Sequence, residues 1–299
     1  MKKHHKLILG TVQLGLPYGI ANTTGQPDIA NAKAIVAAAM RCGIAAFDTA
    51  HAYGTSEEVL GESLKDIHTP TRVISKLPAE LRGTKGEGTR CLELSLKALQ
   101  RESLFALLFH REEHLPLLDG PLGEDISSLL QEGLIEKFGI SVYTEAQALL
   151  ALQHPLISIV QLPTSLLDRR FEQAGVFAEA KRSGKCIHIR SALLQGILTM
   201  PADRLPNHLG GLVPAVQRFH EICDLAHVPP ASLALGWLLR RFPECEVLFG
   251  AERPEQIREN MSSLDHVATL EESIFEALDT LNPPQEAVLL NPSLWTPES

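Results

Sequence analysis

The chain has 299 residues, of which 44% are hydrophobic and 21% charged, and its formal net charge is −9 at pH 7. This size allows a large buried core, and the acidic balance argues against nucleic acid and an anionic membrane surface as partners. The five cysteines show no C-x-x-C spacing, which favours reduced thiols over a disulfide scaffold. No apolar run is long enough to span a membrane, and none follows the basic N-terminus as a secretion signal would. We therefore expect a cytoplasmic protein; the sequence does not indicate its oligomeric state.

Eight short apolar segments alternate with helical segments along the chain. The predicted strands end near residues 10, 48, 76, 110, 141, 161, 190 and 250. Helices are expected over residues 31–41, 56–65, 90–101, 126–132, 144–153, 170–182, 216–226, 232–241, 254–261 and 270–281. The strands lack a clean period-two alternation, which is typical of parallel strands that are covered on both faces.

No stretch interrupts this alternation as a linker between domains would. We predict an α/β protein, with a single (β/α)8 TIM barrel over residues 1–299 and a C-terminal tail after about residue 282 that lies outside the barrel. A doubly wound parallel sheet is the alternative, since periodicity does not separate the two. At the start of the second long helix, Thr55 and Glu58 fit a capping box.

Polar residues stand at the ends of three neighbouring predicted strands. Asp48 ends the second strand, Lys76 the third and His110 the fourth, and Tyr53 lies on the loop that leaves the second strand. The carboxyl ends of barrel strands meet at one rim, where active sites are built. We therefore expect these four side chains to share one pocket.

These residue types suit the reduction of a carbonyl group, which needs a hydride on carbon and a proton on the developing alkoxide. The Tyr53 hydroxyl can supply the proton, although the ordinary pKa of tyrosine is about 10. A nearby ammonium lowers such a pKa; Lys76 can provide it, and Asp48 can hold Lys76 by an ion pair. His110 can orient the carbonyl oxygen.

The stretch from Asp48 to Gly54, Asp-Thr-Ala-His-Ala-Tyr-Gly, resembles the D-T-A-x-x-Y-G signature of the aldo-keto reductases. The order of Asp48, Tyr53, Lys76 and His110 resembles the catalytic tetrad of that family, and the resemblance covers roughly residues 7–282. It implies a barrel enzyme that reduces aldehydes or ketones with NAD(P)H, with Tyr53 as the general acid and a small-molecule carbonyl compound as substrate.

Residues 249–260 resemble the cofactor segment of the same family, which has a strand end, a glycine turn and a helix start. The resemblance implies that Arg253 pairs with the 2′-phosphate of NADPH. NADPH is the expected cofactor and NADH the alternative, because Gln256 stands where many members have an arginine. The implied cofactor-binding residues are Thr11, Ser141, Gln161, Arg190, Ser191, Gly250, Ala251, Arg253, Glu259 and Asn260.

The sequence departs from the family pattern at the ends of two strands. Val142 replaces an asparagine that many members have after the fifth strand, and it cannot bond the nicotinamide amide through its side chain. Arg190 replaces an aromatic residue that stacks on the nicotinamide in many members. A guanidinium can stack on a ring, or it can clamp a carboxylate or phosphate, so an anionic substrate is one expectation.

The same residues fit three other interpretations. His110, Glu113 and His114 fit the H-x-x-E-H pattern of a zinc hydrolase, but the pattern follows a strand-like run and we expect no metal. Lys76 can act as a Schiff-base nucleophile in a barrel aldolase. A barrel that binds nicotinamide and has a regulatory role without turnover is the third alternative.

Overall fold

The eight predicted strands pair in parallel and in sequence order into a closed barrel. This is a computed structural model, and it describes residues 6–281 and 286–295. The strands are β1 (Leu7–Gly10), β2 (Ala46–Asp48), β3 (Arg72–Lys76), β4 (Leu104–Phe109), β5 (Ile135–Ser141), β6 (Ile159–Pro163), β7 (Cys186–Arg190) and β8 (Glu246–Phe249). The predicted TIM barrel is confirmed and the doubly wound sheet is excluded.

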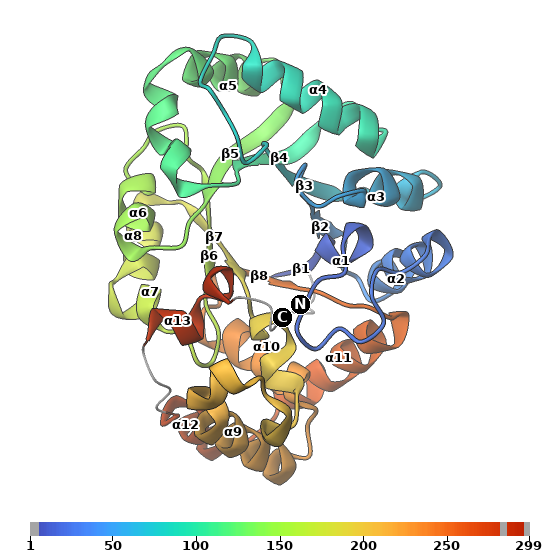
Figure 1. Ribbon diagram of the computed structural model, residues 1–299, viewed down its shortest axis with the longest axis vertical. Helices are drawn as coiled ribbons and strands as arrows, with labels where there is room; N and C mark the ends of the chain where they lie inside the picture. The colour runs from blue at the N-terminus through green and yellow to red at the C-terminus, as the bar shows by residue number, and fades with distance from the viewer. Residues whose placement is uncertain (1–5, 282–285, 296–299) are drawn as a thin grey trace.

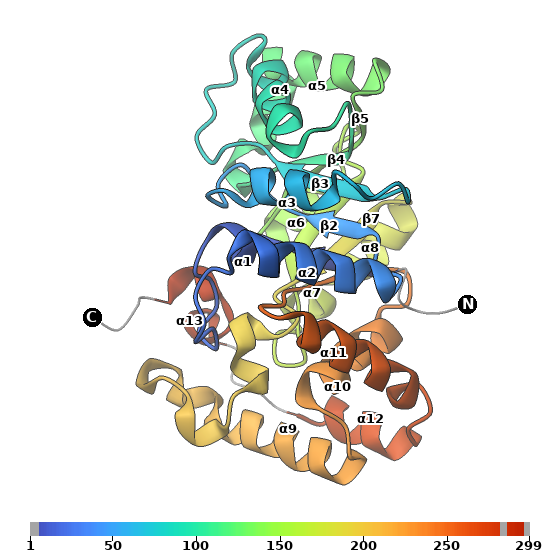
Figure 2. The same cartoon turned by 90° about the vertical axis from the view of Figure 1, so that its right-hand side faces the viewer.

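Helices surround the strands (Figure 1). They are α1 (Val12–Gly15), α2 (Ile29–Arg41), α3 (Ser56–Leu64), α4 (Glu87–Leu99), α5 (Pro121–Gln131), α6 (Glu145–Ala151), α7 (Arg170–Gln173), α8 (Val176–Ser183), α9 (Val213–Ala226), α10 (Pro230–Arg241), α11 (Pro254–Val267), α12 (Glu272–Asp279) and α13 (Ala287–Leu290). Short 3-10 turns are η2 (Glu112–Asp119), η3 (Leu194–Thr199), η4 (Ala202–Arg204), η5 (Asn207–Leu212) and η6 (Pro292–Leu294). In both views α9 and α12 pack together at one end of the molecule (Figure 2).

Two details of the predicted helices are wrong. The expected helix over residues 170–182 is split into α7 and α8, because Gly175 adopts a φ of 76° between them. The expected capping box at Thr55 does not form, since its backbone is not extended (φ −89°, ψ 12°) and its side chain accepts no cap hydrogen bond. The Thr55 hydroxyl instead accepts from the Gln26 amide at 3.2 Å.

The tail after residue 282 begins with residues outside the described range and continues as α13, which packs on η5. Its placement outside the barrel domain stays a prediction. In the described part of the chain no single helix is long and apolar enough to span a membrane, although the pair Asn207–Ala226 and Pro230–Arg241, bent by 92°, reaches that length and hydropathy together.

Alternation along the strands determines which side chains enter the barrel. Successive side chains point to opposite faces, so one set packs outward against the helices and the other fills the interior. The interior cluster is Ile8, Ala46, Ile74, Ala106, Leu108, Ile159 and Leu248. Asp48, Lys76 and His110 stand two residues beyond members of this cluster, and the same alternation turns their side chains inward above this apolar layer.

A polar group forms part of the barrel wall near the amino ends of β3 and β8. The Glu246 carboxylate accepts from Arg72 at 2.7 Å and lies 3.1 Å from Nε2 of His188. Burial opposes ionisation, but the hydrogen bonds from His188 and Arg72 prevail and lower the pKa of Glu246 to about 2. Glu246 is therefore ionised in the folded protein at neutral pH.

Candidate active site

A cavity of about 600 Å³ lies at the carboxyl ends of the strands. Every site residue predicted from the sequence lines it except Lys76, which is buried and bonded to Asp48. The lining residues among them are Thr11, Asp48, Tyr53, His110, Ser141, Gln161, Arg190, Ser191, Gly250, Ala251, Arg253, Glu259 and Asn260. The lining residues therefore come from the ends of seven strands, and Lys76 of β3 lies buried beside them.

Lys76 and Asp48 form an ion pair that is withdrawn from solvent. The Lys76 ammonium donates to Oδ1 of Asp48 at 2.5 Å and to the carbonyl of Thr49 at 3.0 Å, and the two side chains are 1% and 3% exposed. The second carboxylate oxygen accepts from the Gln161 amide at 2.8 Å. Burial lowers the pKa of Lys76, and the Asp48 carboxylate opposes that shift.

Tyr53 lies next to this pair, on a turn that packs against α1. The Lys76 ammonium is 5.0 Å from the centre of the Tyr53 ring. The approach of the turn to α1 requires Gly15, because a Cβ at that position would be 1.9 Å from the Tyr53 carbonyl oxygen. Hydroxyl groups of Thr11 and Ser56, 2.8 Å apart, join the loop after β1 to the start of α3. The position of Tyr53 is therefore set by backbone packing on both sides of its turn.

The electrostatic setting of Tyr53 differs from the sequence expectation. Burial raises its pKa and the Asp48 carboxylate raises it further, whereas the Arg190 guanidinium lowers it. The Lys76 ammonium, which the sequence suggested would lower this pKa, is held in an ion pair with Asp48. Tyr53 is therefore protonated at neutral pH in this structure, as a proton donor must be before the reaction.

The rings of His110 and Tyr53 pack edge to face. The two ring centres are 5.7 Å apart and the planes cross at 88°. Burial lowers the pKa of His110 to about 3, and the nearby cations Lys76 and Arg190 act in the same direction. Its Nδ1 is buried and has no hydrogen-bond partner among the described residues. A neutral imidazole with an unused ring nitrogen can bind a polar group that enters the cavity.

Ser141 and Gln161 lie side by side on β5 and β6, and Arg190 ends β7. The Arg190 guanidinium stacks on the Tyr143 ring at 4.1 Å from its centre. It also donates to the carbonyl of Val142 at 3.1 Å, so that Val142 contributes through its backbone to this end of the cavity.

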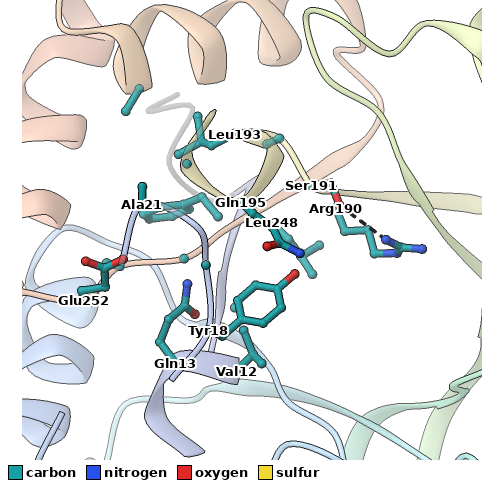
Figure 3. Close-up of a pocket in the computed structure, with 18 of the residues that line it drawn as sticks. Val12, Gln13, Tyr18, Ala21, Arg190, Ser191, Leu193, Gln195, Leu248 and Glu252 are labelled. Carbon is teal, nitrogen blue, oxygen red and sulfur yellow. Dashed lines mark hydrogen bonds between the residues drawn. The ribbon is translucent and has the colours of Figure 1, made fainter. Parts of the chain in front are cut away.

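The opposite part of the cavity is formed by the end of β8 and the first turns of α11. The side-chain oxygen of Gln256 is occupied, because it accepts from the backbone N–H groups of Glu252 and Arg253 at 2.7 and 3.2 Å. Glu252 lines the cavity beside them, and its burial raises its pKa. In Figure 3, Glu252 and Arg190 lie on opposite sides of the labelled residues, with Tyr18 and Leu248 between them.

Sequence reasoning missed several lining residues in the segments that follow the strands. Gln13 and Tyr18 come from the segment after β1, Tyr143 from the loop after β5, and Gln195 from η3 after β7. The side-chain oxygen of Gln13 is buried and has no partner among the described residues. The only signal in the sequence was that long polar loops follow these strands, which does not say which side chains turn inward.

The structure does not support the two other enzyme readings. His114 is buried with its ring against Phe109, and Glu113 is exposed and pairs with Arg111. No group of three metal-binding side chains occurs within residues 6–281 and 286–295. The segment is a 3-10 turn that contains Pro116, so it does not place both histidines on one helical face. The Schiff-base reading needs an accessible lysine, and Lys76 is 1% exposed.

Comparisons with known proteins agree with this geometry. A sequence model described as the Aldo/keto reductase family matches residues 6–283. An NADH-specific methylglyoxal reductase of Escherichia coli K12 is 25% identical over 282 residues, covering 81% of this chain and 86% of that protein. An L-glyceraldehyde 3-phosphate reductase of the same strain is 26% identical over 303 residues, with 87% and 86% covered.

A solved structure shares the fold. The holo form of an aldo-keto reductase from Bacillus halodurans superposes with a TM-score of 0.74 at 20% identity and covers 94% of this chain and 93% of its own. The family match spans nearly the whole barrel, from before β1 to beyond α12. The chain therefore belongs to the aldo/keto reductase family of oxidoreductases.

Proposed function

We propose that this protein reduces the carbonyl group of a small aldehyde or ketone with a reduced nicotinamide dinucleotide. The observation that carries the proposal is the convergence of Tyr53 and His110 above the buried Lys76–Asp48 pair, at one side of a cavity whose other side is the start of a long helix. The five cysteines are free thiols. Free thiols and the family relationship both fit a cytoplasmic protein, and the cytoplasm is the location that we propose.

The residues around the cavity fit such a cofactor. Because the Gln161 amide nitrogen is bonded to Asp48, its amide oxygen is the atom left to accept from the nicotinamide carboxamide, beside Ser141. Gln13, whose side-chain oxygen has no hydrogen-bond partner among the described residues, and the start of α11 also line the cavity. Helix starts favour anions through their free N–H groups, so the diphosphate belongs near α11, with Glu259 and Asn260 toward the adenine.

The chain's own side chains handle the oxygen of the substrate. When bound, the reduced nicotinamide supplies a hydride to the carbonyl carbon. Neutral His110 donates a hydrogen bond to the carbonyl oxygen and holds it near Tyr53, and the Tyr53 hydroxyl gives its proton to that oxygen as negative charge develops. Lys76, held by Asp48, stabilises the tyrosinate that is left until solvent returns the proton.

The charges near α11 favour NADH over the NADPH expected from the sequence. Arg253 is the one cation that lines this part of the cavity in the described chain, while the carboxylates of Glu252 and Glu259 also line it. Gln256 serves as a cap rather than as a phosphate ligand. A 2′-phosphate would bring two further negative charges to this place, whereas the 2′-hydroxyl of NADH can donate to Glu252.

Titration of the purified protein with NADH and with NADPH, followed by cofactor fluorescence, tests the proposal before any substrate is known. We expect saturable binding of both, tighter for NADH by about tenfold, and a reversal of that order in a Glu252→Gln, Gln256→Arg double variant. Equal affinities that the double variant leaves unchanged would refute the proposed preference. Absence of binding by either cofactor would refute the oxidoreductase proposal itself.

A further inference from the structure

Arg190 carries a charge that the protein leaves unbalanced. It makes no ion pair with any carboxylate in the described part of the chain, although it is half-buried at the end of β7. Among the acids that line the cavity, Asp48 is already paired with Lys76 at 2.5 Å. Glu252 lies on the far side of the residues drawn in Figure 3. Partly burying an unpaired cation is unfavourable, so a ligand anion is the natural partner.

The contacts of Arg190 orient its guanidinium but do not neutralise it. The plane stacks on Tyr143, one terminal nitrogen donates to the carbonyl of Val142 at 3.1 Å, and the other donates to the hydroxyl of Ser191 at 3.4 Å. Its Nε is buried without a partner among the described residues. An arginine has five N–H donors in a fixed fork, so each terminal nitrogen keeps a second N–H for an acceptor in the cavity.

The position of Arg190 is on the side of the cavity where the reaction takes place. Arg190 ends β7, which pairs with β6, and Gln161 of β6 donates to Asp48 at 2.8 Å. The field of Arg190 also lowers the pKa of both Tyr53 and His110. All three residues line the same cavity as Tyr143. A substrate whose carbonyl oxygen meets Tyr53 and His110 therefore has its remaining atoms within the surroundings of the guanidinium.

We propose that Arg190 and Tyr143 form a subsite for an oxyanion, a carboxylate or phosphate group that the carbonyl substrate carries. The inference rests on the proposed function and adds the substrate class, an acidic aldehyde or ketone. The guanidinium fork binds two oxygens of such a group, and the stacked Tyr143 ring keeps the fork in place. An uncharged aldehyde gains nothing from this contact.

Pairs of aldehydes that differ in one acidic group test whether the subsite binds an anion. At constant ionic strength, kcat/KM is determined for 4-carboxybenzaldehyde against methyl 4-formylbenzoate, and for glyceraldehyde 3-phosphate against glyceraldehyde. We expect the wild type to favour at least one acidic member by tenfold or more, and the pair that shows it identifies a carboxylate or a phosphate. Arg190→Gln should lower that preference at least tenfold, and Arg190→Lys should restore part of it. Arg218→Gln, which removes an exposed arginine of α9, should leave the preference unchanged.

A binding measurement separates this inference from the proposed function. Calorimetric titration with benzoate and with inorganic phosphate, with and without oxidised cofactor, should show binding of at least one anion that Arg190→Gln weakens at least tenfold. If no aldehyde is reduced but this binding is seen, the proposed function fails and the subsite stands. Equal kcat/KM for the neutral and acidic members, or anion binding that survives in Arg190→Gln, would overturn the subsite. If Arg190→Gln weakens NADH binding and lowers kcat/KM for every aldehyde by the same factor, the subsite is also overturned, because Arg190 would then bind the cofactor.

Discussion

Replacing Lys76 by methionine removes the cation from an ion pair that is buried on both sides. The charged atoms are 2.5 Å apart, which at an effective dielectric constant of about 20 corresponds to about 7 kcal/mol of attraction. Desolvation of both groups cancels most of this, but removal of one partner leaves an uncompensated buried charge and costs about 3–5 kcal/mol. We expect Lys76→Met and Asp48→Asn each to lower the free energy of unfolding by about 3–5 kcal/mol.

The double variant should lose less than the sum of the two single losses, by at least about 2 kcal/mol, because no buried charge is left without a partner. The measurement is urea unfolding followed by circular dichroism and tryptophan fluorescence. The matched control is Lys181→Met, whose pair with Glu244 has side chains 71% and 61% exposed at 2.9 Å and should contribute little to stability, because solvent screens exposed pairs. Additive losses in the cycle, or a loss for Lys76→Met as small as the control's, would refute the reasoning.

Three further outcomes follow from the structure. Glu246→Gln should lower the free energy of unfolding by about 3 kcal/mol at pH 7, because the folded protein depresses the pKa of Glu246 from 4.5 to about 2. The difference in stability between wild type and variant should shrink only as the pH falls from 4.5 to about 2. Acid unfolding curves in which that difference stays unchanged down to about pH 3 would contradict this. Because the pKa of His110 is about 3, kcat/KM should show no ionisation of this group between pH 5 and pH 8. A limb near pH 6.5 that disappears in His110→Gln would be contrary evidence. Gly15→Ala should displace Tyr53 and lower kcat by more than tenfold, with a smaller effect on NADH affinity. The control is Gly210→Ala, where an added Cβ meets nothing within 4 Å; it should change neither quantity in the same steady-state and binding assays.

The sequence predicted the barrel because its signals are local. Short apolar runs alternate with helical segments, and the ends of β2, β3 and β4 carry Asp48, Lys76 and His110 whether or not the loops are known. Parallel strands in sequence order then bring these ends to one rim. Thr55 and the break at Gly175 were misread because their backbone angles depend on how each segment packs on its neighbours.

The rest of the site depends on loop conformation, which local patterns do not determine. Leu194 and Gln195 adopt positive φ angles of 47° and 52°, and neither residue type signals such a conformation. Gln13 and Tyr18 reach the cavity through the path of the segment after β1. The electrostatic setting is also non-local: the pKa of Tyr53 depends on burial and on the charges of Asp48 and Arg190, which the fold brings close to it.

The most direct test of the proposed chemistry is a single turnover of the bound cofactor in Tyr53→Phe. NADH is first titrated to saturation, and its absorbance is then followed after mixing with excess 4-carboxybenzaldehyde and, separately, with methyl 4-formylbenzoate. The proposed mechanism predicts that the variant binds NADH within about threefold of the wild type but oxidises it at least about 1,000-fold more slowly. Oxidation at the wild-type rate in Tyr53→Phe would show that Tyr53 is not the proton donor and would contradict the mechanism.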